Sequence, residues 1–146
     1  MRGYFGIGIY QSKTVENVGT LWRSAHNFGA KFIFTIGRRY KKQASDTTKA
    51  WKSIPLYNYE TLEQFYENMP HDCRLFGVEQ CERSEDLKDF QHPEQAIYLL
   101  GAEDHGLTAQ IIEKCHGVIS IDTPMCLNVA VAGSVLMYDR VSKLTK

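Results

Sequence analysis

The amino-acid sequence predicts an α/β fold, with a mainly parallel sheet that carries helices on both faces. Short apolar runs recur along the chain, and most are continuous rather than alternating, which is typical of strands buried on both faces. Segments with the apolar period of a helix lie between these runs. Because strands and helices alternate in this way, the strands are expected to pair in parallel.

Five runs are the expected strands, at residues 4–10, 31–36, 74–79, 96–100 and 117–121. The first expected helix carries its apolar residues at Val18, Leu21, Trp22, Ala25 and Phe28. The second repeats the pattern at Leu62, Phe65 and Tyr66, and the third at Leu107, Ile111 and Ile112. Residues 37–53 show no such period and are expected to form a loop between strands.

A last helix is expected over about residues 127–144, and it is apolar nearly all round as far as Asp139. Such a helix must be buried on more than one side. Its small residues would let another backbone approach closely; they are Ala130, Ala132, Gly133 and Ser134. The second burying surface is either another copy of the protein, in a two-fold dimer, or another part of the same chain.

The chain has the size and composition of one globular domain, over residues 1–146. Hydrophobic residues make up 43% and charged residues 23%, which indicates a packed core. The formal net charge is zero, so affinity for a nucleic acid would have to come from a local basic patch. No secretory signal and no segment of membrane-spanning length are evident, so we expect a cytoplasmic protein.

The sequence predicts no metal site and no disulfide. Its four cysteines form no Cys-x-x-Cys pair and no tight group with histidines, so reduced thiols are the expected state. Asp104 and His105 follow Glu103 directly, but three consecutive side chains rarely converge on one ion. The glycine fingerprint of dinucleotide-binding proteins is also missing, which disfavours a nucleotide-dependent oxidoreductase.

Candidate functional side chains begin in the first expected helix. Asn17 lies where that helix is expected to start, so its side chain could cap the first free N–H groups. Arg23 falls among the apolar positions, and a buried guanidinium needs a carboxylate or phosphate partner. The alternative for Arg23 is a surface ion pair, since Glu16 is near in sequence.

Two further segments place polar side chains where a strand ends and a helix follows. In "LLGAEDHGL", residues 99–107, Glu103 is the expected partner of Arg23, or else a solvated or helix-capping acid. In "IDTPMCLNVAVAG", residues 121–133, Asn128 could cap the last helix or bind a ligand. Cys126 precedes that helix, but no base stands near it in sequence to make it a nucleophile.

One basic concentration stands out, at Arg38, Arg39, Lys41 and Lys42. Aromatic residues interleave with these cations and with the lysines that follow, a composition suited to phosphate contacts and base stacking. A solvated loop is the alternative interpretation.

The three strand-end segments resemble, in order and spacing, the signature motifs of the SpoU family of RNA ribose methyltransferases, in the SPOUT superfamily. The first motif is an Asn, a Gly and an Arg on the helix, and it matches Asn17, Gly19 and Arg23. The second is Leu-Gly-x-Glu followed by Gly-Leu, and it matches Leu100, Gly101, Glu103, Gly106 and Leu107. The third matches Leu127, Asn128, Val129, Val131 and Ala132. The resemblance covers nearly the whole chain.

This resemblance implies a C-terminal deep trefoil knot, one of the rare exceptions to the unknotted rule. It also implies a homodimer packed through the last helix, and S-adenosylmethionine held by backbone groups of the strand-end loops. The positions matching those loops are Val78, Gly101, Ile121 and Leu127. Many relatives have Ser where Cys126 stands, and the loop at residues 122–125 is shorter than in many of them.

The function implied is methyl transfer from S-adenosylmethionine to a ribose 2′-hydroxyl of tRNA or rRNA. Arg23 would act on that hydroxyl as a base or as an electrostatic stabiliser, with Glu103 placing it. Asn17 and Asn128 would hold the first and third motifs in register. RNA recognition would fall to the dimer surface, with Arg38, Arg39, Lys41 and Lys42. The alternatives are a non-catalytic RNA-binding protein on the same fold, or a methyltransferase acting on a base.

Overall fold

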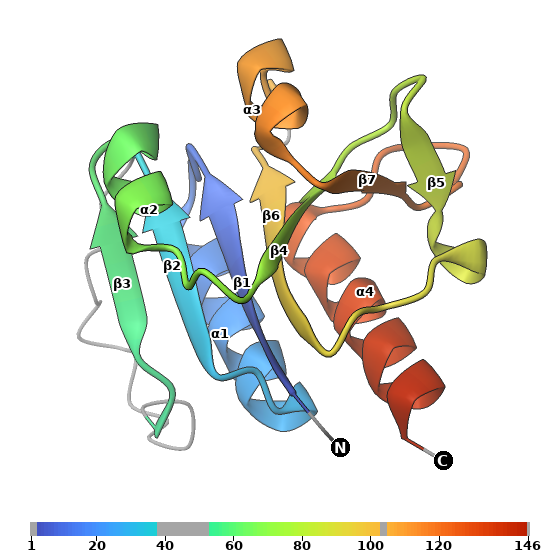
Figure 1. The fold of residues 1–146 in the computed structure, drawn as a ribbon, viewed down its shortest axis with the longest axis horizontal. Coiled ribbons are helices and arrows are strands. Elements are labelled where there is room, and N and C mark those ends of the chain that lie inside the picture. The colour runs from blue at the N-terminus through green and yellow to red at the C-terminus, as the bar shows by residue number, and fades with distance from the viewer. Residues whose placement is uncertain (1–2, 38–52, 103–104, 146) are drawn as a thin grey trace.

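The computed structural model describes residues 3–37, 53–102 and 105–145, which form one seven-stranded sheet (Figure 1). Every pairing in this sheet is parallel, and the strand order is β3-β2-β1-β6-β4-β7-β5. The strands are β1 (Tyr4–Tyr10), β2 (Phe32–Ile36), β3 (Leu56–Tyr59), β4 (Arg74–Val78), β5 (Ser84–Asp86), β6 (Gln95–Gly101) and β7 (Gly117–Ser120). The expected parallel α/β sheet is therefore confirmed.

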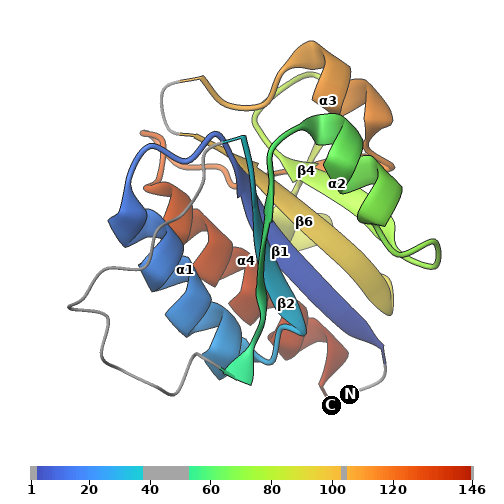
Figure 2. The ribbon, with the colours of Figure 1, turned by 90° about the vertical axis from the view of Figure 1, so that its left-hand side faces the viewer.

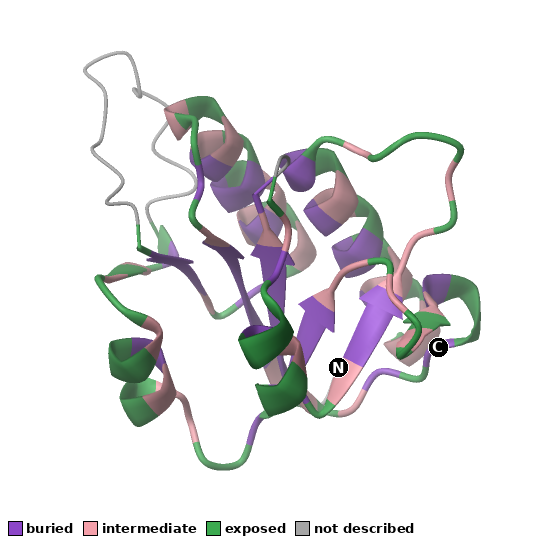
Figure 3. Cartoon of the chain, turned by 90° about the horizontal axis from the view of Figure 1, so that it is seen from above, coloured by how far each residue is buried: buried purple, intermediate pink, exposed green. Residues whose placement is uncertain are grey.

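Helices cover both faces of this sheet, as Figure 2 shows in an edge-on view. One face carries α1 (Val15–Phe28) and α4 (Val129–Leu144), and the other carries α2 (Leu62–Asn68) and α3 (Ala109–Lys114). A short 3-10 helix, η2 (Leu87–Asp89), lies between β5 and β6. Two buried clusters result, one on each face, and the strands lie between them (Figure 3).

The central strand β6 shows why its sequence is continuously apolar. Ala96, Tyr98 and Leu100 belong to the cluster under α1 and α4, whereas Ile97 and Leu99 belong to the cluster under α2 and α3. Successive side chains point to opposite faces of a strand, so a strand covered on both sides needs an apolar residue at each position.

Two strands were not predicted from the sequence, because neither contains a continuous apolar run. β3 has the sequence LYNY and lies at one edge of the sheet, with two exposed residues at its centre. β5 has the sequence SED, is three residues long, and lies at the other edge. In addition, α3 begins at Ala109, so Leu107 precedes it rather than belonging to it.

The small residues of α4 serve close packing within the chain. A Cβ atom at Gly133 would lie 2.5 Å from Cδ1 of Leu21 in α1, so glycine permits this approach of the two helices. Ser134 also donates a hydrogen bond to the hydroxyl of Ser24, at 2.8 Å. The stripe on the opposite side of the helix stays open, with exposed fractions of 47% at Val131, 40% at Val135 and 63% at Tyr138.

The C-terminal half of α4 is anchored by buried polar groups. Arg140 is fully buried and donates hydrogen bonds to the carbonyl oxygens of Pro93 and Glu94, both at 2.7 Å. His92 lies within 2.7 Å of an Asp139 carboxylate oxygen, and burial lowers its pKa despite that carboxylate. Lys143 donates to the carbonyl oxygen of Leu87 at 2.6 Å. These contacts tie α4 to the segment 87–94.

Candidate active site at the carboxyl edge of the sheet

The segments that carry the candidate residues converge at one edge of the sheet. Parallel strands end at a common edge, and ligands of open α/β sheets bind just outside it. The loops after β1, β4, β6 and β7 all leave from this edge, and α1 and α4 both begin there (Figure 1). Motifs far apart in the sequence therefore meet.

A cavity of about 310 Å³ opens at this edge. Three of the four residues predicted to bind the cofactor line it, namely Val78, Gly101 and Leu127. The fourth, Ile121, is not among its lining residues and instead lines a separate hollow with Asp122 and Asp139. The chain thus brings parts of the second and third motifs, together with the end of β4, to one concave surface.

Glycines let the backbone form the wall of this cavity. A Cβ atom at Gly101 would lie 2.4 Å from the carbonyl carbon of Gly106, so no side chain fits there. Gly106 has a φ of +61°, in the left-handed region that favours glycine. Its N–H donates to the carbonyl oxygen of Ala102 at 2.8 Å, which closes the turn. Backbone groups of the loop therefore lie directly against the cavity.

Glu79 is a functional candidate that sequence reasoning missed. Its carboxylate accepts hydrogen bonds from the N–H of Leu107 at 2.8 Å and from that of Gln80 at 3.1 Å. It also lines the cavity. The available signal was its place directly after β4, where a strand-end acid could reach the neighbouring loop. Glu79 thus ties the end of β4 to the loop that follows β6.

Asn17 and Asn128 are in direct contact although 111 positions separate them. The amide nitrogen of Asn128 donates to the side-chain oxygen of Asn17 at 3.0 Å. The side-chain oxygen of Asn128 accepts from the N–H groups of Ala130 and Val131, at 2.9 and 3.2 Å, so the predicted cap of α4 is confirmed. This pair joins the first motif to the third.

The predicted capping role of Asn17 is wrong. The N-cap of α1 is Thr14, and Asn17 lies inside the first turn. From that position its side-chain oxygen accepts the hydrogen bond from Asn128.

Arg23 is exposed, so the expectation that its guanidinium is buried is also wrong. Its neighbours Leu21, Trp22 and Ala25 face the core. Each residue turns the helix by about 100°, which takes position 23 out of the buried stripe. Glu103, its predicted partner, lies outside the described residues, as do Arg38, Arg39, Lys41 and Lys42.

All four cysteines are free, and burial raises the pKa of Cys115 to about 11, which keeps that thiol protonated. Cys126 lines the cavity and is exposed. Over residues 3–37, 53–102 and 105–145, no group of three metal-ligating side chains comes together. Within the same ranges, no helix is long and apolar enough to cross a membrane.

Comparison with known proteins gives a consistent result. A mouse protein named tRNA (guanosine(18)-2′-O)-methyltransferase TARBP1 is 26% identical over 84% of this chain, which spans only 8% of that protein. A structure concerned with 2-OH methylation of C/U34 on tRNA is 25% identical, with a TM-score of 0.81, and 98% and 97% of the two chains are covered.

An AdoMet-bound rRNA methyltransferase from Sinorhizobium meliloti shares the fold, with a TM-score of 0.86 at 18% identity. The match covers all of this chain and 59% of that one. The model of one family, described as the SpoU rRNA methylase family, matches residues 5–138. The resemblance seen in the three motifs is thereby confirmed, and the chain belongs to the SpoU rRNA methylase family.

Proposed function

We propose that the chain transfers a methyl group from S-adenosylmethionine to a ribose 2′-hydroxyl of a tRNA or rRNA. The carrying observation is the convergence of all three motif segments at the carboxyl edge, where Asn128 bonds Asn17 beside a cavity lined by Gly101 and Leu127. Family membership supports methyl transfer. The names of the mouse relative and of the tRNA-related structure support the ribose oxygen as the acceptor.

The cavity has the features expected of a site for S-adenosylmethionine. Val78, Leu100, Leu127 and Val129 supply apolar walls against which an adenine could pack. Gly101 and Gly106 also line it, and an added Cβ atom at Gly101 would lie 2.4 Å from the backbone of Gly106, so this part of the wall carries no side chain. When bound, the cofactor supplies a methyl group already activated by its sulfonium. The chain's own residues have to align the acceptor and help remove one proton.

Arg23 is the residue proposed to act on the acceptor hydroxyl. It lies on α1 six residues after Asn17, and its exposed position leaves it accessible to a large substrate. A guanidinium normally stays protonated, so stabilisation of the developing alkoxide is its simplest role, and proton acceptance is the alternative. Glu103 would place it. Arg38, Arg39, Lys41 and Lys42 are proposed to contact RNA phosphates.

We further propose that the protein is a homodimer packed through α4. Its exposed stripe of Val131, Val135 and Tyr138 continues onto α1, where Phe28 packs edge-to-face on Tyr138 at 6.2 Å between ring centroids. Apolar side chains exposed in one continuous stripe are typical of an interface.

A trefoil knot is proposed for the C-terminal part of this single domain, in which the segment 121–128 would pass through the loop 79–94. The contacts of Arg140 and Lys143 with segment 87–94 support this arrangement, since they hold that segment against α4. A cytoplasmic location accords with a substrate of tRNA or rRNA.

The test incubates the protein with methyl-labelled S-adenosylmethionine and with separate tRNA and rRNA pools that lack its modification, then digests the RNA to nucleosides. A labelled 2′-O-methyl nucleoside is expected. A labelled base would overturn the ribose assignment in favour of base methylation. Cofactor binding measured by calorimetry, with no label in any pool, would favour a non-catalytic RNA-binding protein.

A further inference from the structure

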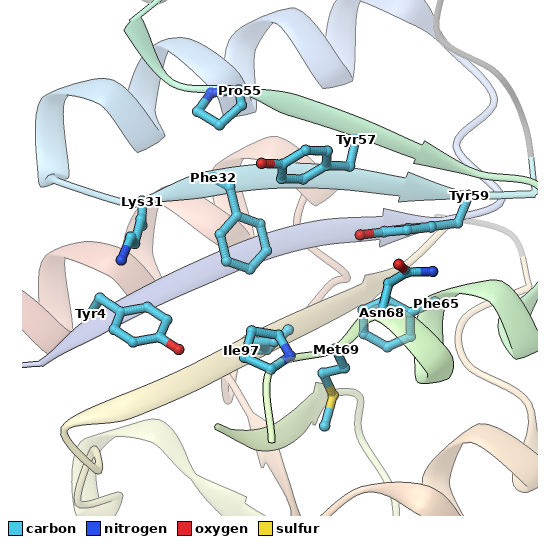
Figure 4. A pocket seen from close by; sticks show the side chains of 11 residues that line it. Tyr4, Lys31, Phe32, Pro55, Tyr57, Tyr59, Phe65, Asn68, Met69 and Ile97 are labelled. Carbon is cyan, nitrogen blue, oxygen red and sulfur yellow. The ribbon is translucent and has the colours of Figure 1, made fainter. Parts of the chain in front are cut away.

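A cavity of about 630 Å³ lies away from the carboxyl-edge site. It is set on the sheet face that carries α2, over β1, β2 and β3 (Figure 4). Its wall is rich in aromatic rings; the lining residues used below are Tyr4, Lys31, Phe32, Tyr57 and Tyr59. None of these five residues belongs to the three motifs that resemble those of the family. We call this cavity the aromatic pocket.

Glycine in β1 creates the hollow. Tyr4, Gly6 and Gly8 point to the same face of the sheet, because alternate residues of a strand do so. A Cβ atom at Gly6 would lie 2.4 Å from Cζ of Phe32, so the ring of Phe32 lies across the strand where a side chain would otherwise stand. The ring of Phe32 therefore forms part of the pocket lining, together with the side chain of Ile97 from β6.

The ring of Tyr57 is exposed to solvent, and the neighbouring rings are fixed by contacts within the chain. Tyr57 and Tyr59 lie two residues apart on the edge strand β3 and therefore on the same face. Their ring centroids are 6.5 Å apart, and Tyr57 is 46% exposed. Phe32 packs against Tyr57 with 5.8 Å between centroids. The Tyr4 hydroxyl donates to the Asp72 carboxylate at 2.9 Å, which fixes that ring. An aromatic surface of this kind loses little conformational freedom when a flat ligand stacks on it.

Lys31 is the group of the pocket lining that can attract an anion. The lining includes one cation, Lys31, and no carboxylate. The Lys31 ammonium lies 4.5 Å from the centroid of the Tyr4 ring, beside the open face of the pocket. Asp72, the acid at the margin, is engaged by the Tyr4 hydroxyl. Rings for stacking beside one cation for a phosphate are the elements that bind an unpaired nucleotide.

We propose that the aromatic pocket binds an unpaired nucleotide of RNA, with its base on Tyr57 or Tyr59 and its phosphate near Lys31. The volume falls within the usual range of small-ligand pockets, which is about 300–1,000 Å³. Because the pocket is separate from the carboxyl edge, this nucleotide is not the methylated one. The pocket is a second contact that selects RNAs with a single-stranded segment. The choice of RNA as the occupant rests on the function proposed above.

The test measures binding of a fluorescein-labelled single-stranded RNA octamer of mixed sequence by anisotropy, with a duplex of the same sequence for comparison. Tyr57→Leu removes a stacking ring and is expected to weaken octamer binding by about 5- to 100-fold. Tyr57→Phe keeps the ring and is expected to bind like wild type. Lys31→Ala is expected to weaken binding and to reduce its salt dependence.

Lys114→Ala is the matched control, because Lys114 also lies over a tyrosine, Tyr66, at 5.4 Å, but outside the pocket. Octamer binding that is unchanged in both Tyr57→Leu and Lys31→Ala would overturn the proposal. An equal loss in Lys114→Ala would do so too, since it would indicate general charge attraction. A change of oligomeric state in Tyr57→Leu, with octamer binding intact, would identify the face as a protein interface instead.

This experiment is independent of methyl transfer. If the chain proves inactive towards tRNA and rRNA, octamer binding still tests the pocket. If the chain is active, Tyr57→Leu is expected to raise KM for an RNA substrate with little change in kcat, because the ring contacts a nucleotide away from the reaction.

Discussion

The carboxyl-edge cavity and the aromatic pocket are lined by different kinds of group. The carboxyl-edge cavity is walled by turns that only glycine permits, and it is held by Glu79, Asn17 and Asn128 through hydrogen bonds. The aromatic pocket is made of ring faces standing on three strands. At the carboxyl edge, an added side-chain atom would clash with backbone. In the aromatic pocket, a substitution removes or keeps a ring on which a ligand can stack. Substitutions in the two regions should therefore fail in different ways.

The largest expected effect is on chemistry at the carboxyl edge. Arg23→Ala is expected to lower kcat for methyl transfer by about 100- to 1,000-fold, the usual cost of losing a group that stabilises a developing oxyanion. Cofactor affinity, measured by calorimetry, should stay near the wild-type value. Arg74→Ala is the control, because Arg74 is an exposed arginine at the opposite end of β4. Full activity in Arg23→Ala would remove this residue from the mechanism.

Gly101→Ala is expected to break the backbone wall. The added Cβ atom meets backbone 2.4 Å away, so the turn has to shift, at a cost of about 1–3 kcal/mol. This corresponds to a loss of about 5- to 150-fold in affinity for S-adenosylmethionine. Calorimetry measures it, and octamer binding should not change.

Gly29→Ala is the control for Gly101→Ala. Gly29 has a φ of +83°, but nothing lies within 4 Å of its Cβ position, so only backbone strain of about 1–2 kcal/mol is added there. If both variants lose the same cofactor affinity, general destabilisation and not the wall explains the result.

The fold could be predicted from the sequence because strands buried on both faces form continuous apolar runs. The continuous apolar run of β6 reflects two covered faces, and the helical periods around Trp22 and Ile111 reflect one buried stripe each. β5 could not be predicted, since three residues with polar side chains at a sheet edge carry no burial signal.

The site was predicted in part, for a similar reason. Motif spacing identified Gly101 and Asn128, because strand-end turns and caps depend on local residue types. The apolar positions around Arg23 wrongly predicted that its guanidinium is buried, because its exposure depends on the exact rotation of α1 against its neighbours. The aromatic pocket was not foreseen at all, because Tyr4, Phe32 and Tyr57 meet only after three strands have paired.

Substitution of the helix caps of α4 and α2 is expected to have smaller effects, because each of these helices contributes to the wall of one cavity. Asn128→Ala removes the cap of α4 and is expected to lower the free energy of unfolding by about 0.5–2 kcal/mol, with reduced cofactor affinity. Thr61→Ala removes the cap of α2, whose side chains line the aromatic pocket, and should affect octamer binding instead. Urea unfolding measures the stability of both variants.

The double variant Asn17→Ala/Asn128→Ala isolates the contact between the motifs. The double variant should lose less unfolding free energy than the sum of the losses in Asn17→Ala and Asn128→Ala. The expected difference is about 0.5–1.5 kcal/mol, the usual net value of one hydrogen bond. Strict additivity would mean that the Asn17–Asn128 bond contributes nothing to stability.

Gly6→Ala is expected to have the smallest effect, and it tests directly whether the carboxyl-edge cavity and the aromatic pocket are independent. Here too a Cβ atom would meet its neighbour at 2.4 Å, but that neighbour is the ring of Phe32 rather than backbone. Phe32 is only half-buried and borders an open pocket, so its ring can swing into that space. The unfolding free energy should fall by less than the roughly 1–3 kcal/mol typical of overpacking. Octamer affinity should fall several-fold, because the displaced ring occupies the place of the base, while cofactor affinity stays unchanged. An equal loss of cofactor affinity would show that the two cavities are coupled through β1 and are not the independent sites that their construction implies.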